Sequence, residues 1–227
     1  MKQTLADTAY TYLLDMILTN QIKSGDRIPE QNIISQLNIS RTPVREAIRR
    51  LVADGIVDLS PGTFALVHRF TKKEMMDMGA IRITIDSLAA QFAILNGSNH
   101  DFQNLITLAA ECQRAFDNND IIERIRLDCE FHTMLTTIGG NKELISIQQR
   151  LTKRSRLMQI QSYNQEGASF CDLAGHLDII KALMDRNVDQ CLQMVHNHLK
   201  HFYLSDDNDL NLDTIRTYVK IPVYNLD

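Results

Sequence analysis

The sequence SRTPVREAIRRL at residues 40–51 is the strongest structural signal in the chain. Arginines recur every four residues along it, at Arg41, Arg45 and Arg49, on one face of a predicted helix. Pro43 is expected at the first position of the helix, because the N–H that proline lacks has no partner in the first turn, and Thr42 is expected to cap the N-terminus of the helix. A short helix with arginines near its N-terminus has the features of a helix that reads the DNA major groove. Its apolar residues have the i, i+3, i+4, i+7 spacing of a second, buried face: Val44, Ala47, Ile48 and Leu51.

The neighbouring sequence separates this interpretation from the commoner one, an ordinary surface helix with a solvated basic face. Apolar periodicity predicts helices over 8–21 and 30–37, and residues 38–40 form a tight connection into the arginine-bearing helix. Two short helices joined by three or four residues have helix-turn-helix spacing. Two β-prone runs, 55–59 and 63–67, flank a Ser-Pro-Gly turn and predict a hairpin that would form a wing.

The segment LNISRTPVREAIRRLVADGIVDLSPGTFALV at residues 37–67 resembles the winged helix-turn-helix of GntR-type bacterial transcription regulators. The resemblance covers about the first 70 residues and implies binding to double-stranded operator DNA. The family's basic residue near Gln31 is missing, and the wing tip is Ser60-Pro61-Gly62, so we expect few phosphate contacts per monomer and reliance on a homodimer. The DNA-contacting residues that it implies, with Arg49 added from the same helix face, are Ser40, Arg41, Thr42, Arg45, Arg49 and Gly62.

Composition agrees with a regulator that works inside the cell. The net charge is −4, but residues 1–70 hold eight Lys/Arg and seven Asp/Glu, so DNA affinity would come from the local arginine cluster. We find no apolar run long enough to span a bilayer and no secretion signal, and therefore expect a cytoplasmic protein without membrane contact. The four cysteines contain no CxxC pair and are typical of scattered core residues in a reducing compartment.

Beyond Phe70 the pattern becomes helical throughout, with no proline between Pro61 and Pro222. The sequence therefore predicts a mainly α protein, a winged helix-turn-helix followed by an all-α antiparallel bundle. We expect a DNA-binding domain at 1–70, an effector-binding and dimerisation domain at 71–205, and a C-terminal tail at 206–227. The predicted bundle helices are 71–96, 101–116, 120–138, 142–163, 169–185 and 188–204.

Polar residues on apolar stripes of the bundle indicate a metal site. Asp128 and His132 stand four residues apart on the stripe of one predicted helix, and His176 and His198 lie on the apolar faces of two others. A lone core histidine is usually only hydrogen-bonded, and an Asp–His pair is often a buried ion pair. One carboxylate and three imidazoles from three helices nevertheless form a suitable ligand set for Zn²⁺, Ni²⁺ or Mn²⁺.

The segments LDCEFH, GHLDIIKAL and HNHL resemble the FCD ligand-binding domain of the FadR subgroup, and a single long first helix resembles its six-helix, VanR-like branch. The resemblance implies Asp128, His132, His176 and His198 as metal ligands. His196 and His201 match less well, because the family's last ligand precedes Leu, as His198 does. The resemblance also implies Arg82 and Asn141 as effector contacts; Arg154 or Arg156 are alternatives to Arg82, and Asn141 is equally suited to cap a helix.

These observations together predict a DNA-binding regulator, not an enzyme, that binds a palindromic operator as a dimer. A small carboxylate or sugar acid would bind at the metal and control DNA affinity. The alternative is a metalloenzyme that uses the Asp/His₃ site to activate water, with the winged domain as an appendage. A third possibility is a purely structural metal with another protein as the effector.

Overall fold

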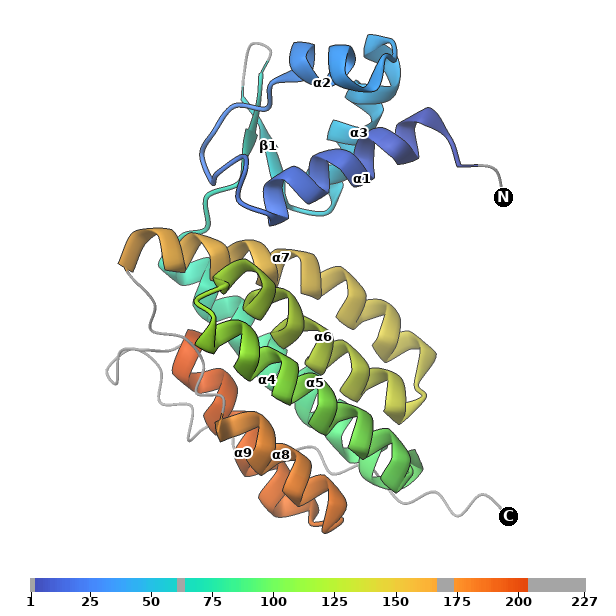
Figure 1. Ribbon diagram of the computed structural model, residues 1–227, viewed down its shortest axis with the longest axis vertical. Helices are drawn as coiled ribbons and strands as arrows, with labels where there is room; N and C mark the ends of the chain where they lie inside the picture. Colours follow the sequence, from blue (N-terminus) through green and yellow to red (C-terminus); the bar gives the residue numbers. More distant parts are fainter. Residues whose placement is uncertain (1–2, 61–63, 167–173, 204–227) are drawn as a thin grey trace. The chain divides into compact units, whose positions relative to one another are not determined.

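The computed structural model describes residues 3–60, 64–166 and 174–203. The chain divides into two compact units, one of Met1–Phe70 with Lys153–Gly167 and one of Thr71–Thr152 with Ala168–Asp227. Within the first unit, three helices and a two-stranded sheet follow one another along the chain (Figure 1). They are α1 (Leu5–Leu18), α2 (Glu30–Leu37), α3 (Arg41–Ala53), β1 (Val57–Leu59) and β2 (Ala65–Val67).

The core of the first unit lies where α1 packs on α3. The four apolar side chains expected on the buried face of α3 are at most 3% exposed, and they meet buried side chains of α1 such as Leu13 and Ile17. Asn38 takes a left-handed conformation, with φ of 50°, and ends α2 three residues before α3 begins. The predicted helix-turn-helix is therefore confirmed.

Two predicted helix starts in the first unit were wrong. The helix α3 begins at Arg41 with Ser40 as its N-cap, and Pro43 occupies its third position. That position costs no hydrogen bond either, because none of the first four N–H groups of a helix has an intrahelical partner. The helix α1 begins at Leu5, since Thr4 and Asp7 form a reciprocal capping box just upstream of the apolar pattern.

The predicted hairpin is present but shorter than the β-prone runs. The strands β1 and β2 pair antiparallel, with Val57 opposite Val67 and Leu59 opposite Ala65. Gly55, at φ of 70°, still belongs to the turn that ends α3, so the strand starts two residues later than predicted. Gly62, the predicted wing-tip contact, lies outside the described residues.

The second unit is helical, as predicted, and short connections join α4 to α5, α5 to α6, α6 to α7 and α8 to α9. Thr71 and Ser98 each form a capping box that starts a helix, with Glu74 and Asp101 respectively. Figure 1 shows α5 beside α6, and α8 beside α9. The helices are α4 (Lys72–Asn96), α5 (Asn99–Asp117), α6 (Ile121–Gly139), α7 (Lys142–Glu166, continuing into the first unit), α8 (Ala174–Met184) and α9 (Val188–Tyr203).

The helix α4 is central to this packing, because both α6 and α9 pack on it. At Gly79 an added Cβ would lie 2.4 Å from Cβ of Tyr203, so the missing side chain lets α9 approach closely. By length and composition α4 could cross a membrane, which corrects the expectation that no segment of the chain is apolar enough. The most apolar stretch of α4 is 61% buried, and the helix carries the buried charged residues Arg82 and Asp86. Both features are typical of a core helix.

The predicted tail at 206–227 lies outside the described residues, as does Cys171. The other three cysteines, Cys112, Cys129 and Cys191, are free and buried, as expected of core residues.

Candidate metal centre and nucleic-acid interface

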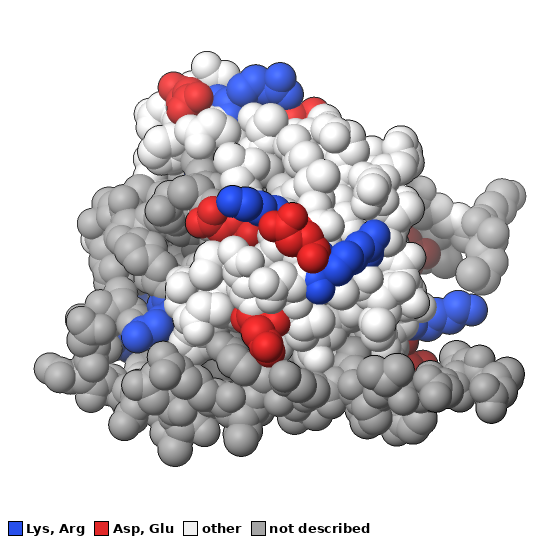
Figure 2. All heavy atoms as spheres, turned by 90° about the horizontal axis from the view of Figure 1, so that it is seen from below, with Lys and Arg blue, Asp and Glu red and all other residues white. Residues whose placement is uncertain are grey.

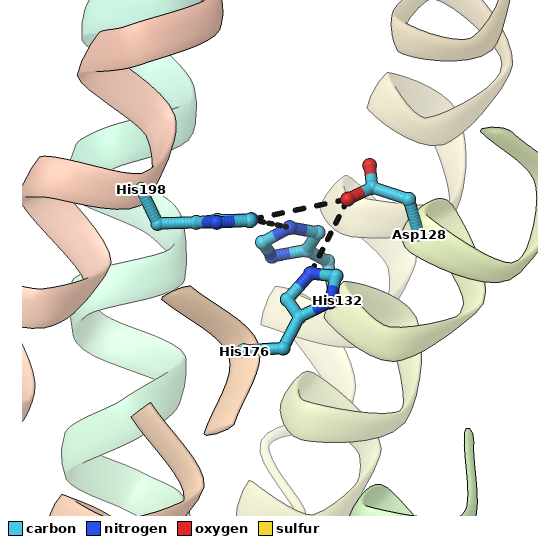
Figure 3. Close-up of side chains that lie close together, drawn as sticks. All are labelled: Asp128, His132, His176 and His198. Atoms are coloured by element: carbon cyan, nitrogen blue, oxygen red, sulfur yellow. Dashed lines mark hydrogen bonds and ion pairs between the residues drawn. The ribbon is translucent and has the colours of Figure 1, made fainter. Parts of the chain in front are cut away.

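Four buried side chains from three helices of the second unit converge in its interior (Figure 3). Asp128 and His132 come from α6, His176 from α8 and His198 from α9. All four are at most 5% exposed. Each offers one ligand atom, and the four atoms lie within 4.8 Å of one another. The structure thus brings together the four residues that the sequence singled out.

The distances between these atoms suit a shared metal ion. His132 Nε2 lies 3.3 Å from His198 Nε2. Asp128 Oδ1 lies 3.2 Å from His176 Nε2 and 3.8 Å from His198 Nε2. Ligands at about 2.1 Å from one ion lie roughly 3 Å apart when adjacent and about 4.2 Å apart when opposite. A buried carboxylate with three imidazoles in this arrangement therefore fits Zn²⁺, Ni²⁺ or Mn²⁺.

Local packing holds the imidazoles in place. Asp128 and His132 share one face of α6 because residues four apart on a helix are neighbours. The ring of Phe131, which is fully buried, stacks on the His176 ring with centroids 4.1 Å apart. Gly175 makes room for His198, since a Cβ at residue 175 would lie 2.7 Å from His198 Nδ1. Gly175 was not among the predicted site residues, although it directly precedes a predicted ligand.

The charges of the cluster favour metal binding at neutral pH. Burial opposes ionisation of Asp128, but a hydrogen bond from His176 and the nearby imidazoles outweigh it and lower the pKa of Asp128 well below its usual value. Burial also lowers the pKa of His132 well below 6.5 and that of His198 to about 3. A carboxylate beside imidazoles that resist protonation is the form in which these groups bind metals.

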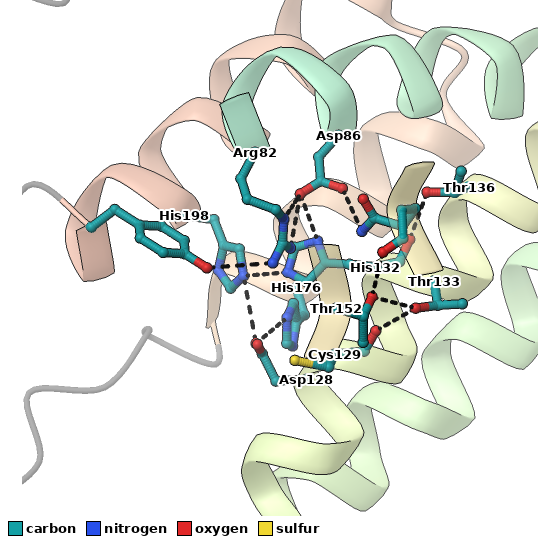
Figure 4. Close-up of polar contacts among 12 residues, drawn as sticks. Arg82, Asp86, Asp128, Cys129, His132, Thr133, Thr136, Thr152, His176 and His198 are labelled. Atoms are coloured by element: carbon teal, nitrogen blue, oxygen red, sulfur yellow. Dashed lines mark hydrogen bonds and ion pairs between the residues drawn. The ribbon is translucent and has the colours of Figure 1, made fainter. Parts of the chain in front are cut away.

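A second layer of polar side chains adjoins the cluster (Figure 4). Arg82 and Asp86, one turn apart on α4, form an ion pair at 2.9 Å and are at most 1% exposed. Burial disfavours the charge on Arg82, but Asp86 outweighs it and raises the pKa of Arg82. Asp86 Oδ2 lies 3.4 Å from His132 Nδ1. The predicted effector residue Arg82 therefore lies in the layer next to the ligands, paired with a carboxylate that the sequence analysis did not identify.

The other residues considered for this site lie elsewhere or have other contacts. Asn141 accepts a hydrogen bond from the Leu144 N–H and so caps the first turn of α7; its contact with an effector stays a prediction. Arg154 and Arg156 belong to the first unit, whereas Arg82 shares the second unit with the four ligands. His196 is buried but is not part of the four-residue group, and the side chain of His201 lies outside the described residues.

The predicted DNA-contacting residues of α3 and its N-cap are exposed, namely Ser40, Arg41, Thr42, Arg45 and Arg49. Two of them, Arg41 and Arg45, border a hollow of about 590 Å³ together with Arg27. Arg27 lies in the loop before α2, forms a β-bridge to Leu66 and places its guanidinium 5.2 Å from the centre of the Phe64 ring. Arg27 was not among the predicted DNA contacts, because it stands outside the helical pattern. It adds a cation beside the neutral Gln31, which lines the same hollow.

Charge is otherwise dispersed over the face shown in Figure 2, where basic and acidic side chains alternate on a mainly uncharged surface. The described residues on this face form no broad basic patch of the kind that binds nucleic acid without regard to sequence.

Replacing His198 by Asn should flatten the acid dependence of stability in the metal-free protein. Between pH 6.5 and about 3 the unfolded chain binds a proton at His198 that the folded chain does not, so stability falls as the pH falls. In urea unfolding, the free energy of unfolding of the variant should fall less steeply with pH than that of the wild type, by up to about 1.4 kcal/mol per pH unit. His100→Asn, at an exposed position, is the control. Equal slopes for His198→Asn and the wild type would contradict the assignment.

Comparison with known proteins agrees with both units. Residues 5–67 match the model of bacterial regulatory proteins of the gntR family, and residues 77–201 match the FCD domain. The regulator YdhC of Bacillus subtilis is 26% identical over 85% of this chain and 86% of its own length. The Nta operon transcriptional regulator of Aminobacter aminovorans is 27% identical over 82% of this chain and 88% of its own.

Solved structures share the fold. McbR/YncC of Escherichia coli has a TM-score of 0.74 at 20% identity and covers 87% of this chain and 94% of its own. A GntR transcriptional regulator from Rhodococcus sp. RHA1 has a TM-score of 0.76 at 18% identity, with coverage of 88% and 96%. The matched domains and relatives are those of transcriptional regulators and not of enzymes. The chain belongs to the GntR family of bacterial transcriptional regulators and carries an FCD domain behind its winged helix-turn-helix.

Proposed function

We propose that this regulator binds a near-palindromic operator as a homodimer and that a metal-bound small acid in the helical bundle controls its DNA affinity. The observation that carries the proposal is the convergence of Asp128, His132, His176 and His198 within 4.8 Å in the bundle interior. In this scheme residues 1–70 bind DNA, residues 71–205 bind the effector and the second subunit, and the protein acts in the cytoplasm.

The DNA-binding part rests on the exposed N-terminal end of α3. Arg41 and Arg45 offer guanidinium groups to guanine edges or phosphates, and the unpartnered N–H groups of the first turn favour anions. Ser40 supports this role, because its side chain makes no capping hydrogen bond within the helix. Glu30 lies 3.7 Å from Arg45, and both residues line the hollow. Arg27 supplies a third cation for the DNA backbone.

The homodimer rests on an apolar stripe along the solvent side of α4. Its five side chains are exposed or half-buried and have the alternating spacing of four and three residues that two helices use to pack on each other. A twofold axis would place the same stripe of both subunits in contact, as an isologous interface requires. The stripe consists of Ile81, Ile85, Leu88, Phe92 and Leu95.

The sensing part rests on the ligand set and on Arg82. Four protein ligands on an octahedral ion leave two positions, which a carboxylate effector would fill. Arg82 would complete its recognition with a charge-assisted hydrogen bond, and Asn141 would add a contact. Binding must favour one arrangement of the two winged domains over another, since an effector with no such preference changes nothing. We place the pivot for this change near residues 68–73.

Arg45→Ala should weaken operator binding at least tenfold and leave the oligomeric state intact. A bidentate arginine contributes about 1–3 kcal/mol to recognition of its base pair. The operator is first selected from random DNA with the wild-type protein, and affinity is then measured by fluorescence anisotropy at fixed salt. Arg114→Ala on α5 removes another exposed arginine and serves as the control. Unchanged affinity of Arg45→Ala would rule out this use of α3.

Charges on the α4 stripe should separate the subunits. Ile81 and Leu95 are 49% and 60% exposed, so replacing both by Asp should spare the fold of each subunit while burying charges in the interface. Sedimentation velocity is expected to show a monomer. Leu177→Asp with Met184→Asp on α8, at residues 55% and 45% exposed, is the matched control. A double Asp variant on α4 that sediments as a dimer would place the interface elsewhere.

Loss of two ligands should abolish metal-dependent stability. Zn²⁺, Ni²⁺ or Mn²⁺ at a hundred times its Kd should stabilise the wild type by about 2.7 kcal/mol, because the unfolded chain lacks the site. His132→Ala with His176→Ala should lose this shift and the bound metal measured by mass spectrometry, whereas His100→Ala keeps both. A thermal-shift screen of small carboxylates and sugar acids on the metal-loaded protein then identifies the effector class. Unchanged metal content in the double variant would show that the ligands are wrong.

A further inference from the structure

Asp86 is the most highly connected carboxylate next to the metal cluster, and the proposed function leaves it without a role. It is fully buried on α4, and its Oδ2 accepts a hydrogen bond from Arg82 Nε at 3.0 Å and lies 2.9 Å from Arg82 Nη2 in an ion pair. Gln148 of α7 donates to Oδ1 at 3.1 Å. His132 of α6 approaches Oδ2 with Nδ1 at 3.4 Å. One carboxylate thus joins side chains of three helices (Figure 4).

The two ring nitrogens of His132 face different partners. Nε2 faces the cluster, 3.3 Å from His198 Nε2, while Nδ1 faces Asp86 on the outer side. A neutral imidazole carries its proton on one nitrogen only, and the other nitrogen is then free to bind a metal. A carboxylate opposite Nδ1 keeps the proton there and leaves the lone pair of Nε2 directed at the ion.

We propose that Asp86 is the positioning residue for the metal ligand His132, and that Arg82 and Gln148 hold the Asp86 carboxylate in the orientation that this task requires. The inference rests on the metal site of the proposed function. The two Asp86 oxygens have separate tasks: Oδ1 accepts from Gln148, and Oδ2 carries the contacts with Arg82 and His132.

This arrangement also connects the effector to the metal. The Arg82 guanidinium uses Nε and Nη2 for Asp86, and its Nη1 lies 3.4 Å from the Tyr203 hydroxyl of α9. An anionic effector that binds Arg82 would compete with Asp86 for the same guanidinium group. The strength of the contact between Asp86 and His132 would then depend on whether the effector is bound. Arg82 therefore serves the metal site through Asp86 in addition to its proposed contact with the effector.

The test compares Asp86→Asn with the wild-type full-length protein, using Zn²⁺ alone as the probe. Asn has the shape of Asp and lacks its charge, so we expect Zn²⁺ affinity, measured against a competing chelator dye, to fall 10- to 100-fold. The Co²⁺ absorption spectrum should change, and ¹⁵N NMR should show altered Nδ1–H resonances for His132. Asp86→Glu, which restores the charge, should recover part of the affinity. Ser87→Ala, at the adjacent buried polar residue of α4, is the control and should match the wild type.

Asp86→Asn leaves the Arg82 charge without its carboxylate in the core, so a second variant guards against loss of folding. Arg82→Met with Asp86→Asn removes both charges together, which packed cores tolerate far better than a lone buried charge. It should fold and show the same loss of Zn²⁺ affinity. Wild-type Zn²⁺ affinity and unchanged His132 resonances in either variant would overturn the positioning role. Failure of the wild type to bind Zn²⁺, Ni²⁺ or Mn²⁺ would instead overturn the metal site itself.

Discussion

The burial of the Asp128 carboxylate is the constraint on which the helical unit depends. An ionised carboxylate in a protein core is costly unless charges or hydrogen bonds compensate for it. The compensating groups here are His132 on the same helix, His176 on α8 and His198 on α9. Helices that are distant in sequence must therefore pack in the one register that brings these rings to Asp128. Small residues support the register where the helices approach closely, as Gly175 does beside His198.

Around this centre the polar groups form two layers with different tasks. The inner layer offers one oxygen and three nitrogens, and burial lowers the pKa of two of its imidazoles, those of His132 and His198. The outer layer pairs Arg82 with Asp86 and reaches the inner one through His132 Nδ1. A buried ion pair adds little to stability by itself, because desolvation offsets the attraction between the charges. Its value in this protein is specificity, since it fixes the tautomer and direction of a ligand.

Much of this architecture could be predicted from local patterns. Helical periodicity and turn residues placed the elements to within a few residues, and the Asp128–His132 spacing put both side chains on one face of α6. The errors at the starts of α1 and α3 arose because several first-turn positions tolerate the same residues: Pro43 suits the third position as well as the first. Asp86 could not be predicted, because an Arg–Asp pair four residues apart is most often a surface pair on a helix. Its role is visible only when α6 and α7 are packed against α4. Arg27 was missed for a similar reason, since the hollow that it shares with Arg41 exists only in three dimensions.

X-ray absorption spectroscopy of the metal-loaded protein would identify the ligands of the ion in solution. For an ion held by Asp128, His132, His176 and His198, we expect nitrogen and oxygen neighbours at about 2.0–2.2 Å with the scattering pattern of three imidazoles. Addition of a bound carboxylate effector should change the oxygen shell and leave the imidazoles in place. A sulfur shell at about 2.3 Å, which would indicate cysteine ligands, or the spectrum of the fully hydrated ion would contradict this ligand set.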